Sequence, residues 1–153
     1  MLTASTIYVF NIGNSRLVLG KFYETTQKTE AFQVTHDHTL ARFDERLRIT
    51  KSGGLIAPFK NEMGEFIGPE RIWAPNEKYP GLTVTRTMGL SCSYKLGVNS
   101  EPEISILKFK SCYKFLVLGS DGLWTVEDND EVVSLLAKSH PRSLSAHANT
   151  LIL

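Results

Sequence analysis

Cysteine is scarce in this sequence. Cys92 and Cys112 are the only cysteines among the 153 residues, they share no metal-ligand spacing, and the first residues show no secretory signal. A disulfide framework and a cysteine-ligated zinc site are therefore excluded as organising features. We expect both thiols to be reduced and to pack as small apolar side chains.

Long apolar runs and an excess of one charge are also absent. No stretch approaches the roughly 18 apolar residues of a membrane-spanning helix, and no basic region precedes the first apolar residues. The 17 basic and 16 acidic side chains leave a formal net charge of +1, so no general field attracts nucleic acid or anionic lipid. The sequence predicts an intracellular protein, cytoplasmic or nuclear, with neither a nucleic acid nor a membrane as partner.

Length and composition are those of an ordinary globular domain. Hydrophobic residues make up 42% and charged residues 22% of the chain, close to the averages of soluble proteins. A chain of 153 residues can build one core and is too short for two comfortable ones. We expect one domain, or part of one.

Short apolar runs predict a chain rich in strands. These runs are β-branched and aromatic, and Gly, Asn and Pro separate them. The run 115–118 is continuously apolar and predicts an inner strand, whereas 104–109 alternates and predicts an outer one. Residues 24–30 are polar and predict a loop. The other expected strands are 7–10, 16–22, 32–34, 55–57, 66–67 and 71–73.

Helical spacing is clearest between residues 38 and 49. Apolar residues there predict one face of a helix, with Glu45 and Arg48 on its other faces. Asp37 and His38 precede it and are expected to cap it. Two further helical stretches are expected at 127–138 and 141–148, and periodicity leaves 83–96 unassigned.

Asp121 is the residue best placed to carry chemistry. It follows the apolar run 115–118 as part of Ser120-Asp121-Gly122, so its carboxylate is expected at a strand end, where it could bind a metal or transfer a proton. Taken alone, the Asp-Gly pair is better explained as a simple turn. Asn14, in the first hairpin turn, is likewise explained by turn geometry alone.

Other sites are disfavoured by the residues themselves. His36, Asp37 and His38 form a polar cluster, but neighbours in one strand point to opposite faces and no third ligand is spaced to join them. No Ser-His-Asp, Cys-His or phosphate-cradling Gly-rich motif is present. Without further information, the chain is an α+β domain with one notable aspartate.

Four blocks of the chain resemble the type 2C (PPM-type) metal-dependent protein serine/threonine phosphatases, in the family's order. The first resembles the family's strand, Gly-Asp-Ser-Arg turn and strand. The second resembles its segment from an Asp-His pair to Gly-Gly, the third its Ser-Arg-x-x-Gly-Asp region, and the fourth its Ser-Asp-Gly-Leu-Trp-Asp segment and helix. They read YVFNIGNSRLVL, HDHTLARFDERLRITKSGG, RIWAPNEKYPGLTVTRTMGLSCSYKLGVNSEPEI and FLVLGSDGLWTVEDNDEVV.

The resemblance implies a fold and an activity. Members fold as a β-sandwich of antiparallel sheets flanked by helices, an α+β architecture. They hydrolyse phosphoserine and phosphothreonine in proteins, with water activated between two Mg²⁺ or Mn²⁺ ions. Two such ions need several carboxylates, because they seek hard oxygen ligands and repel each other. Phosphoproteins are the partners that the resemblance implies.

The departures from the family pattern are concentrated at its metal ligands. Asn14 and Leu90 occupy positions where the family has Asp, and Asp121 is the one metal ligand carried over. The family's Asp-Gly-His and Asp-Asn segments would lie before Met1 and after Leu153. The resemblance therefore identifies residues 1–153 as a partial PPM-type domain, the C-terminal half, truncated at both ends, with Mg or Mn not bound tightly.

Three interpretations follow from this pattern. The chain is a piece of a phosphatase domain, for instance from a truncated gene product, or a degenerate non-catalytic fold that acts as a regulatory or binding module. The cut ends favour the first, and Asn14 and Leu90 favour the second, because truncation does not explain internal substitutions. A small independent β-rich interaction domain is a third, which the four ordered blocks disfavour.

Overall fold

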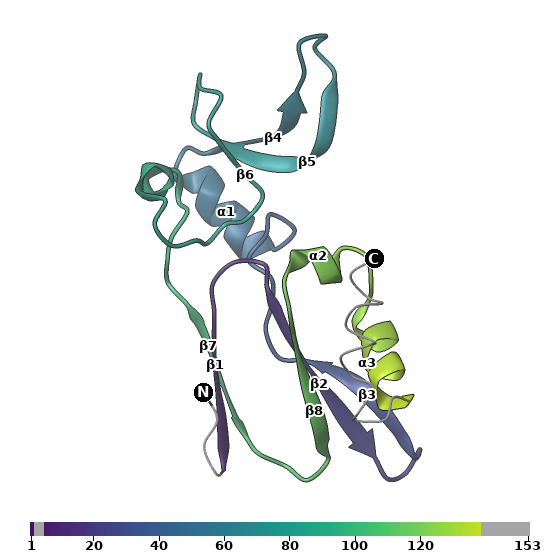
Figure 1. Ribbon diagram of the computed structural model, residues 1–153. Helices are drawn as coiled ribbons and strands as arrows, with labels where there is room; N and C mark the ends of the chain where they lie inside the picture. The colour runs from purple at the N-terminus through teal and green to yellow at the C-terminus, as the bar shows by residue number, and fades with distance from the viewer. Residues whose placement is uncertain (2–4, 139–153) are drawn as a thin grey trace. The chain divides into compact units, whose positions relative to one another are not determined.

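The computed structural model describes Met1 and residues 5–138, which divide into two compact units (Figure 1). The first unit comprises Met1–Asn11, Ser15–His36 and Glu103–Leu153. The second comprises Ile12–Asn14 and Asp37–Pro102. Each unit has its own hydrophobic core, so each is described by itself.

Two antiparallel sheets build the first unit. One has the order β1-β7 and the other the order β3-β2-β8. Ile7 and Val9 of β1 are buried against Leu17 and Leu19 of β2, because side chains at every second position of a strand share one face. The strands are β1 (Thr6–Asn11), β2 (Arg16–Tyr23), β3 (Lys28–Gln33), β7 (Glu103–Lys108) and β8 (Tyr113–Gly119).

Two helices follow β8 and cover the other face of its sheet (Figure 1). They are α2 (Asp121–Trp124) and α3 (Asn129–Lys138). Val132 and Val133 are fully buried in one cluster with Val18 of β2 and with Trp124. Asp130 and Glu131 in the first turn and Lys138 in the last agree with the helix dipole.

The second unit surrounds α1 (Phe43–Lys51). Ile49 of α1 is buried with Leu40, Ile72, Leu96 and Val98. Its strands form one antiparallel sheet of order β4-β5-β6. The remaining elements are β4 (Leu55–Lys60), β5 (Phe66–Trp73), β6 (Pro80–Leu82) and the 3₁₀ helix η1 (Ser91–Leu96).

The predicted fold class is confirmed: the described chain consists of antiparallel sheets with a few helices. Most predicted strands are present, and the predicted helix 127–138 is α3 apart from its first two residues. The unassigned segment 83–96 contains η1 and isolated bridges. The helical stretch expected at 141–148 lies outside the described residues.

Several predicted boundaries are wrong. β3 begins at Lys28 inside the expected loop, since its register with β2 extends to the pair Tyr23–Lys28. β5 is one continuous strand, because a bulge opposite Pro58 absorbs the Gly68-Pro69 interruption. These strands are extended by pairing partners that lie outside their own local sequence.

The helix start and the inner strand are also corrected. α1 begins at Phe43 with Arg42 at its N-cap, not at His38. The backbone of His38 instead bonds Gly13 and Thr85, which prevents it from starting a helix. β8 is an edge strand of its described sheet. Its continuously apolar run is also not buried on both faces, since Leu118 is 72% exposed.

Within residues 5–138, no helix combines the length and the apolar character that a bilayer crossing requires. Cys92 is exposed and Cys112 half-buried, and both are free thiols. The expectation of reduced cysteines agrees with the structure, whereas the packing role predicted for Cys92 does not.

Candidate metal site

Asp121 is the first residue of α2, directly after β8 and Ser120. Asp121 is exposed, as expected for a carboxylate at the end of a strand. Its backbone carbonyl accepts hydrogen bonds from the amide (2.9 Å) and the hydroxyl (2.8 Å) of Thr125. These bonds hold the turn that places Asp121 at the surface of the first unit.

Trp124 locks the turn that carries Asp121. Its ring is buried and packs with Val18, and its indole N–H donates a 2.9 Å hydrogen bond to the carbonyl of Gly119. A Cβ atom at Gly119 would lie 2.7 Å from the indole nitrogen, so only glycine allows the ring to approach this closely. The burial expected for Trp124 is confirmed, while Trp73 is only half-buried.

Arg16 ties the same turn to α3. Its guanidinium carbon lies 5.2 Å from the centre of the Trp124 ring, a cation–π geometry. Its Nη1 donates to Oδ1 of Asn129 at 2.7 Å, and Asn129 donates in turn to Gln33 at 2.8 Å. Arg16 of β2 thereby contacts the Asp121 turn through Trp124 and contacts α3 through Asn129.

Asn14 lies in the turn between β1 and β2, which belongs to the second unit. The preceding Gly13 has φ +95°, a left-handed conformation that favours glycine. The Gly13 amide donates to Nδ1 of the fully buried His38 at 3.1 Å, and the His38 amide donates to the Gly13 carbonyl at 3.0 Å. The turn is therefore held by His38, for which the sequence predicted only a capping role.

Leu90 is half-buried and precedes η1. Its carbonyl accepts hydrogen bonds from the amide (3.0 Å) and the hydroxyl (2.7 Å) of Ser93. Its side chain is a hydrocarbon and offers no ligand atom. Hydrogen bonds thus fix the backbone at Leu90, although the Leu90 side chain cannot bind a metal.

A buried polar cluster holds the segment that leads to Leu90. Glu45 of α1 is fully buried and accepts a two-pronged pair of hydrogen bonds from Arg48, at 2.6 and 2.8 Å. Arg86 also donates to the Glu45 carboxylate at 2.7 Å. The hydroxyl of Thr85 donates to the same carboxylate. Arg86 further donates to the carbonyl of Glu101 at 2.9 Å. Glu45 therefore joins α1 to the start of the segment 85–101, and Arg86 joins that start to its end.

This cluster was missed from the sequence. The spacing of Glu45 and Arg48 is that of an i, i+3 pair on a helix, which was the one available signal. Nothing local indicates that Glu45 points inward, because its partners Thr85 and Arg86 lie about forty residues away in sequence. The placement of Glu45 on a polar face is therefore wrong.

Glu45 is expected to make stability depend on acidity. Burial by itself raises its pKa, but the hydrogen bonds from Arg48, Arg86 and Thr85 lower the pKa well below its ordinary 4.5. Below about pH 4.5 the unfolded chain then binds more protons than the folded one, so the free energy of unfolding should fall by up to about 1.4 kcal/mol per pH unit from this group. Above that pH the contribution is complete.

Urea titrations between pH 3 and pH 6 would measure this slope. The matched variant Glu45→Gln cannot titrate, so its slope should be shallower by the amount assigned to Glu45. Equal slopes in the two proteins would contradict the assignment.

The family model of protein phosphatase 2C matches residues 1–152. The chain belongs to the protein phosphatase 2C family. Among its relatives, it is 35% identical to "Probable protein phosphatase 2C 12" of Oryza sativa subsp. japonica and 37% identical to "Probable protein phosphatase 2C 72" of Arabidopsis thaliana. Each match covers 92% of this chain but only 34% and 41% of the relatives' lengths.

Solved structures agree on the fold. A serine-threonine phosphatase 2C from Toxoplasma gondii matches with a TM-score of 0.80 and 19% identity, over 99% of this chain and 49% of that one. A sex-determining protein of C. elegans matches with a TM-score of 0.69 and 20% identity, over 96% of this chain and 32% of that one. This protein phosphatase 2C chain thus spans about half or less of the proteins it resembles.

Protein phosphatase 2C members are generally metal-dependent, so the fit of this chain's residues to a metal can be tested. Within residues 5–138, no group of three or more His, Cys, Asp or Glu side chains is arranged to hold an ion. Asp121 offers a carboxylate in the first unit, while in the second unit Asn14 offers at most an amide oxygen and Leu90 nothing. The described residues do not fit a site for two divalent ions.

Proposed function

We propose that this chain is the C-terminal half of a protein phosphatase 2C domain and that it is deficient in phosphoserine and phosphothreonine hydrolysis. The observation that carries the proposal is the residue set at the ligand positions. A divalent ion exchanges its hydration shell for protein ligands only when several charged oxygens meet it at once. Asp121 supplies one such group. At position 90 a second is missing, because leucine stands where the family has Asp.

The contacts around the two positions support this interpretation. Trp124 and Arg16 hold the Asp121 turn, and Glu45 and Arg86 hold the segment that contains Leu90. The backbone at both positions is therefore fixed by specific contacts, although the Leu90 side chain cannot bind a metal. A folded chain without the ligands favours a second role, a non-catalytic regulatory or protein-binding module that engages phosphoproteins inside the cell.

The decisive measurement is phosphate release from a phosphothreonine peptide in the presence of Mn²⁺ or Mg²⁺. We expect no metal-dependent release by the chain, and no change in Asp121→Ala or in the control Glu62→Ala, which removes an exposed carboxylate of the β4–β5 hairpin. Manganese-dependent release that Asp121→Ala abolishes and Glu62→Ala preserves would sink the proposal.

Metal binding gives a readout that does not depend on turnover. Calorimetric titration with Mn²⁺ should show no tight site in the wild-type chain. The double variant Asn14→Asp/Leu90→Asp restores the family's carboxylates and is expected to bind Mn²⁺ more tightly. Equal binding by the two proteins would argue against these positions as ligand positions. Binding of the phosphothreonine peptide without turnover would favour the regulatory module.

A further inference from the structure

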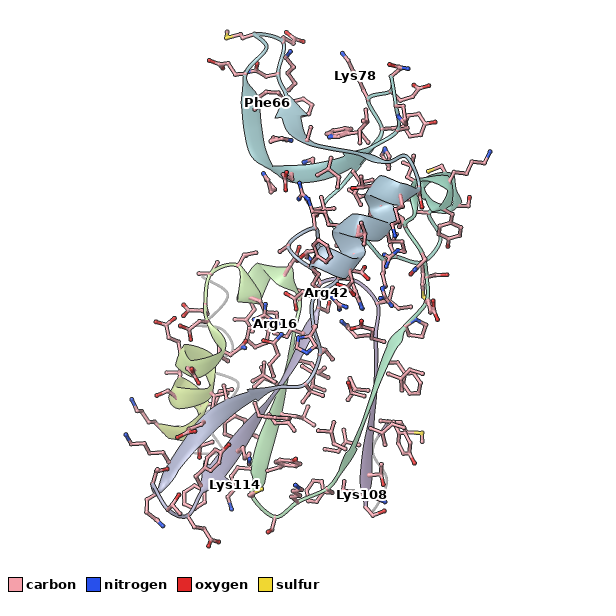
Figure 2. The ribbon with its side chains drawn as sticks, turned by 180° about the vertical axis from the view of Figure 1, so that it is seen from behind. Arg16, Arg42, Phe66, Lys78, Lys108 and Lys114 are labelled. Atoms are coloured by element: carbon pink, nitrogen blue, oxygen red, sulfur yellow. The ribbon has the colours of Figure 1, made fainter. Side chains whose placement is uncertain are left out.

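Lysines from two separate strand connections gather at one end of the first unit. Lys108, Lys110 and Lys114 lie at the turn from β7 to β8, and Lys21 and Lys28 lie at the hairpin from β2 to β3. The amide of Phe22 donates to the carbonyl of Cys112 at 2.8 Å, which joins the two connections. Figure 2 shows Lys108 and Lys114 at this same end.

Positive charges outnumber negative ones at this end. No ion pair of the described residues includes any of these lysines. Glu24 and Glu30 lie on the β2–β3 hairpin, with Glu30 directly opposite Lys21 in the strand pairing, so five lysines meet two carboxylates here. Four further acidic residues of the unit gather where α3 begins, at Glu127, Asp128, Asp130 and Glu131. The first residue of α3, Asn129, binds Arg16. Arg16 pairs with Gly119, the last residue of β8, at the end of that strand opposite Lys114.

An exposed aromatic ring stands among the lysines. Phe109 lies between Lys108 and Lys110 in sequence and is 56% exposed, while its amide is fixed to the Ser5 carbonyl at 2.9 Å. A large exposed apolar ring between two exposed lysines matches a surface that lies in a membrane interface. There the ring enters the headgroup region, and the ammonium groups meet lipid phosphates and carboxylates.

The aromatic residues nearby favour lipid over nucleic acid. The ammonium of Lys21 lies 4.4 Å from the centre of the Tyr23 ring and 5.9 Å from that of Phe32. The ammonium of Lys114 lies 5.1 Å from the centre of the Phe22 ring. An ammonium group thus lies near each of these three rings, where it competes with a base that would stack there. Lysine is also a point charge without the planar fork that arginine offers to nucleic acids.

We propose that this end of the first unit, formed by Lys21, Lys28, Lys108, Phe109, Lys110 and Lys114, is a docking surface for an anionic lipid bilayer. The separation of charge along the unit orients it, with the acidic beginning of α3 directed away from the bilayer. Asp121 follows β8 and lies at the opposite end of that strand, roughly 20 Å from Lys114 at about 3.4 Å per residue. The docked surface therefore leaves the Asp121 turn open, and the proposal does not rest on the activity of the chain.

The first test is binding of the full chain to vesicles of phosphatidylcholine, with and without about one third phosphatidylserine. We expect binding to the anionic vesicles that is at least about tenfold tighter than to neutral ones and that weakens as salt rises. Lys110→Gln/Lys114→Gln should weaken it by about 25-fold, since each lysine at an anionic surface contributes about fivefold. The control Lys51→Gln/Lys95→Gln removes two exposed lysines of the second unit and should change binding by less than about twofold.

A reporter variant tests the contact without loss of a lysine. In Phe109→Trp, the added fluorescence should shift to shorter wavelength with anionic vesicles and stay unshifted with neutral ones, because the ring enters the interface. No shift, equal losses in the two glutamine pairs, or no preference for anionic vesicles would overturn the proposal. Tighter binding of a single-stranded oligonucleotide than of anionic vesicles, lost in Lys110→Gln/Lys114→Gln, would overturn it in favour of nucleic acid.

Discussion

Glu45→Gln is expected to lower the free energy of unfolding by about 3 to 5 kcal/mol. The glutamine keeps the shape of the side chain but removes the charge that Arg48 and Arg86 share. Two guanidinium groups would then face a neutral amide in a fully buried position, and a buried charge without its counter-charge is costly. Urea titration followed by far-UV circular dichroism measures the change.

The chain offers a matched control for this change. Arg46 and Glu70 form a two-pronged ion pair of similar length, 2.6 and 3.0 Å, but both side chains are more than 40% exposed. Solvent screens such a pair, so Glu70→Gln should cost far less than Glu45→Gln. Similar losses in the two variants would show that burial is not the source of the Glu45 effect.

The second large effect is expected at Trp124. Trp124→Ala should lower the free energy of unfolding by about 3 to 5 kcal/mol, because it empties the space between Val18, Val132 and Val133 and leaves the Gly119 carbonyl without its indole donor. Loss of the ring also removes the stacking partner of Arg16. The measurement is again urea titration, with near-UV circular dichroism to follow the aromatic environment.

Trp124→Phe separates packing from the hydrogen bond. Phenylalanine keeps most of the buried ring but has no N–H, so about 1 kcal/mol is expected from the lost bond to Gly119, with a further small loss from imperfect packing. A cost for Trp124→Phe equal to that of Trp124→Ala would contradict the packing explanation. In that case the hydrogen bond to Gly119 would be the main tie of the Asp121 turn.

Local sequence predicted the elements better than their limits. The strand at residues 16–22 was found because an apolar run that follows turn-forming residues is a local property. The start of β3 at Lys28 was not, since it depends on pairing with Tyr23. The helix start at Phe43 was missed for the same kind of reason, because the backbone of His38 is engaged by Gly13 and Thr85.

The candidate site likewise contains residues that the sequence could name and residues that it could not. Asp121 could be named from its motif and from its place after an apolar run, and its role as a ligand stays a prediction. Glu45 could not be named, because polar residues on a helix are usually solvated and its two distant partners are fixed only by tertiary packing. A buried carboxylate is recognised by its counter-charges, and these lie about forty residues away along the chain.

By itself, the sequence determined the family and the antiparallel α+β fold class, because these are properties of ordered motifs; the same motifs predict ligand positions at Asn14, Leu90 and Asp121. Tertiary structure alone decided which polar groups are buried and how charge is distributed. A net charge of +1 suggested no attraction to anionic surfaces, yet two strand connections bring their lysines to one end of the first unit. The physical reason is that net charge is a sum over the chain, whereas an electrostatic surface depends on where folding places each term of that sum.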